Sequence, residues 1–275
     1  NPFVGYAFLA ALETSGSVGA GTGWQPAPIL VEDADGKTVG AMPAYVKGHS
    51  QGEYVFDHSW ADAWQRAGGR YYPKLQIAAP FTPVPGPRLL SQDMAATHHL
   101  IAAAEAITER NGLSSAHATF VEEAQLPFFK DAGWLLREGI QYHWFNNGYE
   151  SFEDFLGALS SRKRKAIRKE RAAAQENVTI RSLKGGEIEE RHWDAFWHFY
   201  QDTGARKWGR PYLERDFFSI IGETMRDEIL LYLAEVDGKP IAGALNFLGS
   251  EALYGRYWGC TVDVPFLHFE LCYYR

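Results

Sequence analysis

The sequence predicts a mixed α/β fold, an α+β arrangement made of two consecutive lobes. Its 275 residues, 46% of them hydrophobic, suffice for one large core or two smaller ones. Segments with strand-like and helix-like patterns alternate in both halves of the chain. Each half also carries a hairpin signal, Asp33-Ala34-Asp35-Gly36 in the first and Asp237-Gly238 in the second. We therefore expect lobes over residues 1–147 and 148–275.

The first lobe is expected to open with a helix and to continue as a strand meander with helices between the later strands. Helices are predicted over residues 6–13, 61–68, 94–109 and 122–132. Strands are predicted over residues 27–32, 38–47, 53–56, 74–79, 114–120 and 142–146. The segment 80–88 contains four prolines, which exclude regular structure there.

The second lobe repeats this alternation. Helices are predicted over residues 151–159, 161–176, 192–207 and 215–225, with a last helix after Pro265. Strands are predicted over residues 178–182, 229–236, 240–248 and 252–259. Ser151 and Asp154 have the spacing of a capping box. Both ends enter or leave helix-like sequence without a cap, so we expect truncation at each end and an incomplete second lobe.

Composition argues against several classes of protein. The net charge of −7 disfavours a role that is mainly nucleic-acid binding. No apolar run approaches the ~18 residues of a membrane span, and no signal segment opens the chain, so we expect a cytoplasmic protein without a membrane span. Two cysteines are too few for a disulfide framework or a cysteine zinc cluster. The pair His98-His99 has no obvious third ligand, so no metal is predicted.

The sharpest chemical signal is a basic helix at residues 162–171, which holds seven Lys/Arg and one Glu. Like charges stand four residues apart, as in Arg164 and Arg168, and each such pair costs about 0.2–0.5 kcal/mol in an isolated helix. A docked anion would relieve this repulsion, and guanidinium groups pair well with phosphate. We predict that Arg162, Arg164, Arg168 and Lys169 bind a phosphate-bearing substrate. The alternative is a solvated face balanced by acidic residues elsewhere.

A second signal is Asp57-His58, which directly follows a strand-like segment. A carboxylate and an imidazole at a strand end are suited to general acid–base chemistry, so both are predicted catalytic residues. The alternative is that Asp57 caps the next helix. Trp60, on that helix, is a predicted substrate-binding residue that would line the groove with Phe81 and Trp208.

The proline-rich segment and its neighbours suggest a preformed binding wall. Proline lowers the conformational entropy of a loop, which suits a rigid ligand contact. Lys74, Phe81 and Arg88 would supply two charges and a ring, or the segment is only a rigid connector. Trp208, flanked by cations, is a candidate stacking residue, although cations near a helix C-terminus are also explained by the helix dipole.

The strand at residues 254–259 contains two glycines, Gly255 and Gly259. Glycine within a strand indicates the close approach of a ligand or of another backbone. The predicted helix that follows would direct its N-terminus to the same place. Tyr257 is a predicted catalytic residue here, and the predicted substrate-binding residues are Arg256, Trp258, Gly259 and His268. The alternative for His268 is an ordinary packing or surface residue.

Several of these segments together resemble one bacterial family. They are YVFDHSWADAW (54–64), YYPKLQIAAPFTPVPGPRLL (71–90), LSSRKRKAIRKER (159–171), YGRYWG (254–259) and HFELCYY (268–274). The chain is similar in these motifs to the FemAB-like, predicted N-acyltransferase family, associated with peptidoglycan biosynthesis or recognition. The resemblance covers essentially the whole chain and implies two tandem lobes of the GNAT acyltransferase fold. It also implies aminoacyl-tRNA or acyl-coenzyme A as the co-substrate, with no permanently bound cofactor. The sequence lacks the pyrophosphate loop of the form [RQ]-x-x-G-x-[GA] and the long helical arm that some Fem enzymes use for tRNA.

These observations lead to one main functional prediction and two alternatives. The main prediction is an acyltransferase that moves an acyl or aminoacyl group from an activated donor, on coenzyme A, an acyl carrier or tRNA, to an amine. A cell-wall precursor is one candidate acceptor. Backbone N–H groups near Tyr257–Gly259 would polarise the donor carbonyl. The first alternative is a non-catalytic binder of a phosphorylated or peptidoglycan-type ligand. The second is RNA binding by the basic helix, against which the acidic net charge argues.

Overall fold

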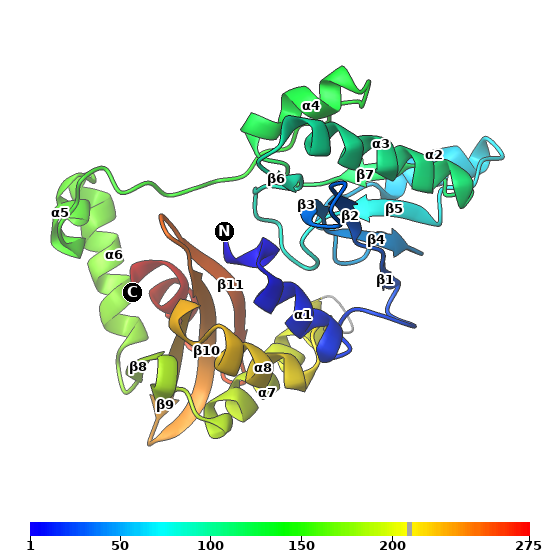
Figure 1. Ribbon diagram of the computed structural model, residues 1–275. Coiled ribbons are helices and arrows are strands. Elements are labelled where there is room, and N and C mark those ends of the chain that lie inside the picture. The colour runs from blue at the N-terminus through cyan, green and yellow to red at the C-terminus, as the bar shows by residue number, and fades with distance from the viewer. Residues whose placement is uncertain (208–210) are drawn as a thin grey trace. The chain divides into compact units, whose positions relative to one another are not determined.

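The structure is a computed structural model that describes residues 1–207 and 211–275. It confirms the predicted mixed α/β class, with sheets that are mostly antiparallel (Figure 1). The chain forms two compact units. Unit 1 comprises Asn1–Arg137 and Tyr212–Phe217, and unit 2 comprises Glu138–Pro211 and Phe218–Arg275. Contacts thus divide the chain after Arg137, and a short segment of the second half belongs to unit 1.

Unit 1 contains a four-stranded sheet of order β1-β4-β5-β7 and a three-stranded sheet of order β2-β3-β6. Its strands are β1 (Trp24–Pro26), β2 (Ile29–Glu32), β3 (Thr38–Met42), β4 (Ala44–Lys47), β5 (Lys74–Ile77), β6 (Leu90–Ser91) and β7 (Ala116–Ala118). Its α-helices are α1 (Tyr6–Thr14), α2 (His58–Arg66), α3 (Met94–Arg110) and α4 (Leu126–Asp131), with 3-10 turns at Pro2–Val4 and Glu123–Gln125.

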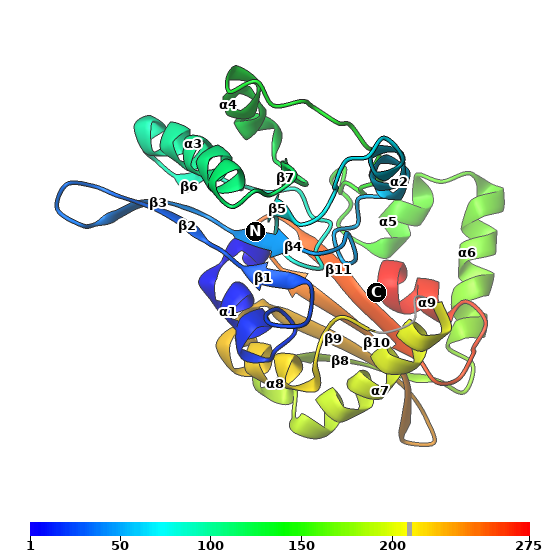
Figure 2. The ribbon, with the colours of Figure 1, turned by 90° about the vertical axis from the view of Figure 1, so that its right-hand side faces the viewer.

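The predicted hairpin in unit 1 is confirmed. Strands β2 and β3 pair antiparallel around the turn, where Asp33 Oδ1 accepts hydrogen bonds from the backbone N–H groups of Asp35 and Lys37 (Figure 2). Gly36 supplies the positive φ of this turn. The single strand expected over residues 38–47 is instead two strands, β3 and β4, in different sheets. They separate at Pro43, which has no N–H to donate to a ladder.

The core of unit 1 lies between these sheets and helix α3. Leu75 and Ile77 of β5 pack with Leu100 and Ile101 of α3. Helix α3 begins at the cap residue Asp93, whose carboxylate accepts from two backbone N–H groups, and it ends before Asn111-Gly112 as predicted. The apolar residues of β5 therefore face α3, and the alternate residues of the same strand face the opposite side.

Unit 2 is built on one antiparallel sheet of order β11-β10-β9-β8. Its strands are β8 (Thr179–Lys184), β9 (Ile229–Val236), β10 (Lys239–Leu248) and β11 (Leu253–Cys260). Its α-helices are α5 (Phe152–Gly157), α6 (Ser161–Ala174), α7 (Glu190–Lys207), α8 (Arg215–Thr224, of which the first three residues belong to unit 1) and α9 (Leu267–Phe269). A π-helical turn covers Glu270–Tyr274, and 3-10 turns cover Gly185–Glu187 and Arg226–Glu228.

Helices cover both faces of the unit 2 sheet (Figure 1). On one face, Phe196 of α7 lies against Gly243 of β10, where a Cβ atom would come within 2.9 Å of the ring. On the other face, Leu267 and Leu271 pack on Ala242 and neighbouring strand residues. The β9–β10 hairpin turns at Asp237-Gly238, both with positive φ, as the sequence predicted.

Two predicted strands are wrong. Residues 53–56 form an irregular loop, because Gly52 and Tyr54 take left-handed backbone angles that a strand does not tolerate. Residues 142–146 lie outside every strand, with Tyr142 and Trp144 exposed. In the described part of the chain, no helix combines the length and the apolar character that a membrane crossing requires.

Candidate functional site

One face of the central sheet of unit 1 is polar and yet buried. Strand register pairs Lys47 of β4 with Lys74 of β5, and it places Gln76 beside His117 of β7. Because side chains alternate along a strand, these four residues share the face opposite to α3. Lys47, Lys74 and Gln76 are fully buried. Burial of two lysines in one sheet requires partners that compensate their charges.

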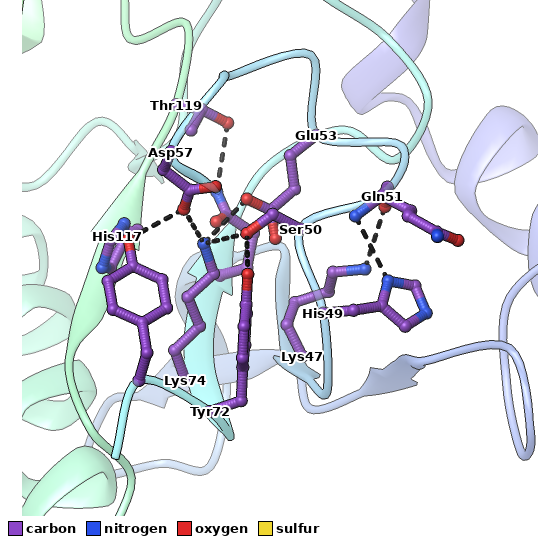
Figure 3. A network of polar contacts seen from close by, with 12 residues as sticks. Lys47, His49, Ser50, Gln51, Glu53, Asp57, Tyr72, Lys74, His117 and Thr119 are labelled. Atoms are coloured by element: carbon purple, nitrogen blue, oxygen red, sulfur yellow. Dashed lines mark hydrogen bonds and ion pairs between the residues drawn. The ribbon is translucent and has the colours of Figure 1, made fainter. Parts of the chain in front are cut away.

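Lys74 is the centre of that compensation (Figure 3). Its Nζ atom lies 2.8 Å from Glu53 Oε2 and 2.8 Å from Asp57 Oδ2, and it donates a third hydrogen bond to Ser50 Oγ at 3.1 Å. Both carboxylates come from the irregular loop at residues 48–57, and both are buried. The left-handed turns at Gly52 and Tyr54 direct Glu53 and Asp57 toward the same ammonium group.

Two tyrosines complete the cluster around Lys74. The hydroxyl of Tyr71 donates to Asp57 Oδ2 at 2.8 Å, and the hydroxyl of Tyr72 lies 2.7 Å from Ser50 Oγ. Both rings lie within 6 Å of Lys74 Nζ, a distance at which a cation is attracted by the π face. We refer to Ser50, Glu53, Asp57, Tyr71, Tyr72 and Lys74, together with Lys47, Gln76 and His117, as the buried polar cluster.

The second lysine of the cluster has weaker compensation. Lys47 Nζ donates to the carbonyl of Gln51 at 3.2 Å and lies 3.7 Å from the centre of the Trp24 ring. Burial, reinforced by the charge of Lys74, lowers the pKa of Lys47 to about 7 against the opposing effect of Glu53 and Asp57. Near neutral pH this amine is therefore divided between its charged and neutral forms.

The two carboxylates of the cluster shift in opposite directions. Burial raises the pKa of Glu53 above its usual range, although Lys74 partly opposes the shift. Burial also acts on Asp57, but hydrogen bonds from Lys74, Ser50 and Tyr71 outweigh it and hold the pKa of Asp57 below its usual range. Asp57 is thus an ionised carboxylate at neutral pH. The Asp57 side chain accepts no hydrogen bond from the first turn of α2, although Asp57 is the residue before this helix. The structure therefore favours neither of the two predicted roles of Asp57, a helix-capping side chain or a catalytic base.

Three buried acceptor atoms of the cluster have no hydrogen-bond partner among the described residues. They are Glu53 Oε1, Asp57 Oδ1 and Gln76 Oε1. The amide nitrogen of Gln76 is engaged with Thr119 Oγ1 at 3.1 Å, which orients its oxygen away from that contact. Burial, followed by the charge of Lys74, lowers the pKa of His117 to about 4, so this ring is neutral at neutral pH.

The structure thus brings together two of the predicted site residues of the first half, Asp57 and Lys74. His58 begins α2 and is exposed, and Trp60 is 64% exposed on the same helix. Phe81 is buried, and it stacks on Tyr212 with the ring centroids 5.0 Å apart. In this structure Phe81 therefore fills the core under the loop, where Gly52 leaves room for its ring.

Arg88 is also buried, and its contacts are made to the main chain. It donates to the carbonyl groups of Val84, Pro87 and Thr119 at 3.0–3.1 Å. Burial lowers its pKa to about 10, so the guanidinium remains charged at neutral pH. These contacts hold the proline-rich segment in place.

In unit 2, the predicted strand with two glycines is β11. Among the described strands it pairs only with β10, so it forms an edge of the sheet. Leu245 is paired with Tyr257 but Asn246 with Gly255, which leaves Arg256 as an extra residue. This β-bulge turns the edge backbone at Arg256. Tyr257, directly after the bulge, is buried against the ring of Tyr200.

The two glycines of β11 differ in what surrounds them. A Cβ atom on Gly259 would lie 2.3 Å from the carbonyl oxygen of Phe199, so α7 crosses the strand at this residue. A Cβ atom on Gly255 would meet only Asn246 Oδ1, at 3.4 Å. The close approach of another backbone, that of α7, therefore explains why residue 259 is a glycine.

The helix expected after β11 is present over residues 267–274, as the three-residue α9 followed directly by a π-helical turn, and Phe266 before it has a left-handed backbone. Only its first three residues are α-helical. Trp258 and His268 do lie together, with ring centroids 5.1 Å apart. His268 is exposed, and Trp258 is half-buried.

The basic helix is α6, and six of its seven Lys/Arg residues fall on two faces. Arg168 pairs with Glu153, and Arg171 forms a bidentate pair with buried Glu270. Arg164 shares that face. Arg162, Lys165 and Lys169 occupy the opposite stripe, at spacings of three and four residues, and they form no ion pair with any described residue. We refer to these three as the exposed cation stripe.

The remaining predictions concern Trp208 and metals. Trp208 lies outside the described residues. Among the residues that are described, no group of three or more His, Cys, Asp or Glu side chains is placed to hold a metal ion.

Sequence reasoning missed most of the buried polar cluster. It did not select Lys47, Glu53, Gln76, His117 or the tyrosine hydroxyls. One signal was available, because Lys74 and Gln76 alternate with Leu75 and Ile77 as in a half-buried strand. Their burial depends on the loop at 48–57, which the pattern does not predict.

Comparison with known proteins gives the family. The profile of the FemAB-like family, described as peptidoglycan biosynthesis/recognition, matches residues 1–275, the whole chain. The chain therefore belongs to the FemAB-like family. No curated protein matches it.

Solved structures similar to the chain include the C-terminal DUF2156 domain of a protein named a lysylphosphatidylglycerol synthetase, from Agrobacterium fabrum. The identity is 11% and the TM-score is 0.49, over 90% of this chain and 64% of that chain. The chain thus spans less than two thirds of the length of that structure.

Proposed function

We propose that the protein is an amide-forming transferase. It moves an acyl or aminoacyl group from an activated donor to a primary or secondary amine. The donor is a thioester of coenzyme A or of an acyl carrier, or an aminoacyl-tRNA ester. The acceptor is the amine of a cell-wall precursor, in keeping with the family description.

The reaction places a specific demand on the protein. The amine nitrogen attacks the donor carbonyl carbon, and the carbonyl oxygen becomes negatively charged. The C–S or C–O bond then breaks, the leaving thiol or hydroxyl takes a proton, and the amine loses one. Backbone N–H groups that are aimed at the carbonyl oxygen are an effective stabiliser of this charge.

The bulged edge strand β11 is the observation that carries the proposal. An edge strand presents alternate N–H groups away from its partner, and a bulge redirects them. The bulge at Arg256 lies directly before Tyr257–Gly259, the segment that was predicted to polarise the donor carbonyl. Tyr257, the next residue, is assigned to the proton that the leaving group receives.

The exposed cation stripe supports a donor or acceptor that carries phosphate. Arg162, Lys165 and Lys169 form no ion pair with a described residue, and the rest of the chain is acidic. Each candidate donor, and a nucleotide-linked precursor, carries phosphate groups that such a stripe would bind. Arg168, in contrast, is already paired with Glu153.

The pKa directions modify the predicted roles of Asp57 and His58. An ionised carboxylate with a lowered pKa holds a cation better than it accepts a proton at neutral pH. We therefore assign Asp57 to holding Lys74. Exposed His58 remains the candidate that accepts the proton of the amine.

Product formation tests this proposal. The purified protein is incubated with acetyl-coenzyme A, an acyl carrier thioester or an aminoacyl-tRNA, together with a nucleotide-linked precursor bearing a free amine. Mass spectrometry should detect the precursor with the added acyl mass for one of these donors. A Tyr257→Phe variant should lower the rate about 100-fold or more, the lower end of what general acid catalysis contributes.

A non-catalytic binding protein is the second candidate, and the exposed cation stripe favours it equally. A binder would saturate with the nucleotide-linked precursor and convert none of it with any donor. Saturable binding without product across the whole donor panel would replace the transferase proposal by this one.

A further inference from the structure

The donors of both lysines in the buried polar cluster are already committed. Lys74 uses its three N–H bonds on Glu53, Asp57 and Ser50. Lys47 is directed to the Gln51 carbonyl and the Trp24 ring. Neither lysine therefore reaches Glu53 Oε1, Asp57 Oδ1 or Gln76 Oε1, which remain buried without a partner among the described residues.

Three such oxygens in one cluster are unusual. A buried polar atom without a hydrogen bond costs about 1–3 kcal/mol, and the cost is larger for a charged group. The two carboxylates meet at Lys74 Nζ, and Gln76 is the next residue along β5 on the same face. The three oxygens therefore belong to neighbouring side chains of the cluster and are acceptors without donors, and we refer to them together as the acceptor site.

We propose that this site binds the primary ammonium group of a ligand. An ammonium on a side chain has three N–H donors and no acceptor, which matches three unpartnered acceptors. Charge favours the same ligand. Two carboxylates, those of Glu53 and Asp57, face the one ammonium group of Lys74, and the carboxylate of Asp57 is ionised at neutral pH. Two carboxylates thus stand against one paired ammonium group, which suits an incoming cation.

The ligand would enter through the loop at residues 48–57, which carries both carboxylates and contains no helix or strand. If the proposed transferase function is right, the ammonium is that of the acceptor, held in unit 1 before it is deprotonated. The acceptor is then a primary amine, so secondary amines are poor substrates.

A ligand series on the unaltered protein tests the site without any acyl donor. The probe is Nα-acetyl-L-lysine. Nα-acetyl-L-norleucine replaces its ammonium by a methyl group, and Nα-acetyl-Nε-trimethyl-L-lysine keeps the positive charge but has no N–H donor on the side chain. Calorimetry should detect binding of the lysine probe, with at least tenfold weaker binding of both analogues.

Two variants locate the site. Glu53→Gln keeps the shape of the side chain but removes its charge, and it should weaken binding of the lysine probe at least tenfold. The matched control is Asp131→Asn, which neutralises an exposed carboxylate of unit 1 and should change binding less than twofold. Circular dichroism and thermal unfolding of each variant verify that it folds.

Three results would overturn the inference. They are no binding of the lysine probe, equal binding of the trimethylated analogue, and equal effects of Glu53→Gln and Asp131→Asn. In the first case the three oxygens hold water only. The ammonium site and the transferase proposal can fail separately. If the protein binds the probe but forms no amide, the ammonium site stands and the transferase proposal fails. If the protein forms amides independently of Glu53, the transferase proposal stands and the ammonium site fails.

Discussion

Replacement of Lys74 by methionine is the sharpest test of the buried polar cluster. The variant shortens the unbranched side chain by one atom and removes a charge that is fully buried between two carboxylates at 2.8 Å. Removing one partner of a buried ion pair costs about 3–5 kcal/mol, because the other charge stays buried without compensation. Both carboxylates depend on the same lysine, so we expect Lys74→Met to lower the free energy of unfolding by an amount within or above this range.

Urea unfolding measures this loss. With a slope of about 2 kcal/mol per molar urea, a loss of about 3–5 kcal/mol lowers the midpoint by about 1.5–2.5 M. Lys130→Met is the control, since Lys130 is an exposed lysine of the same unit, and it should change stability by less than about 0.5 kcal/mol.

A triple variant separates charge from packing. Lys74→Met combined with Glu53→Gln and Asp57→Asn leaves no charge of this trio buried, so most of the lost stability should return. A cost of less than about 1 kcal/mol for Lys74→Met alone, or a triple variant no more stable than the single one, would show that Lys74 does not compensate the two carboxylates.

Three further outcomes follow from the same structure. Gly259→Ala should destabilise the protein by about 1–3 kcal/mol, because the new Cβ atom would meet the α7 backbone. Gly255→Ala, the control, should cost less than about 0.5 kcal/mol. Equal melting temperatures of the two variants would contradict this prediction. The folded-state pKa of His117, about 4, lies below its unfolded value near 6.5, so the free energy of unfolding decreases as the pH falls from 6.5 to 4. The variant His117→Gln should remove up to about 3 kcal/mol of this decrease. If the variant and the unaltered protein show the same pH dependence of unfolding, His117 does not cause the decrease. Arg171→Ala should cost about 3 kcal/mol by leaving buried Glu270 with fewer partners, and a loss similar to that of an exposed arginine would refute the role of this pair.

Local signals in the sequence predicted the elements that depend on local physics. Both hairpins form where Asp and Gly permit positive φ, and α3 is bounded by Asp93 and by Asn111-Gly112 as its capping residues require. The basic helix was also correct, because a Ser cap and good helix formers specify it without distant contacts.

The candidate site depends on distant contacts, and sequence alone predicted only part of it. Asp57 and Lys74 were selected, but the reason for their proximity, the left-handed loop at Gly52 and Tyr54, reads as a strand in the sequence. The position of Phe81 depends on Tyr212, far along the chain, and so a ring predicted to contact ligand is found in the core. Pairings of this kind are set by packing, which residue patterns do not encode.

Formation of the amide bond itself tests the proposed transferase activity. The protein is given a donor with a ¹³C-labelled carbonyl and an acceptor with a ¹⁵N-labelled amine, and the mixture is followed by NMR. A one-bond ¹³C–¹⁵N coupling should develop as free coenzyme A, carrier or tRNA is released in equal amount. Donor cleavage without this coupling, or binding of both substrates without any turnover, would contradict it.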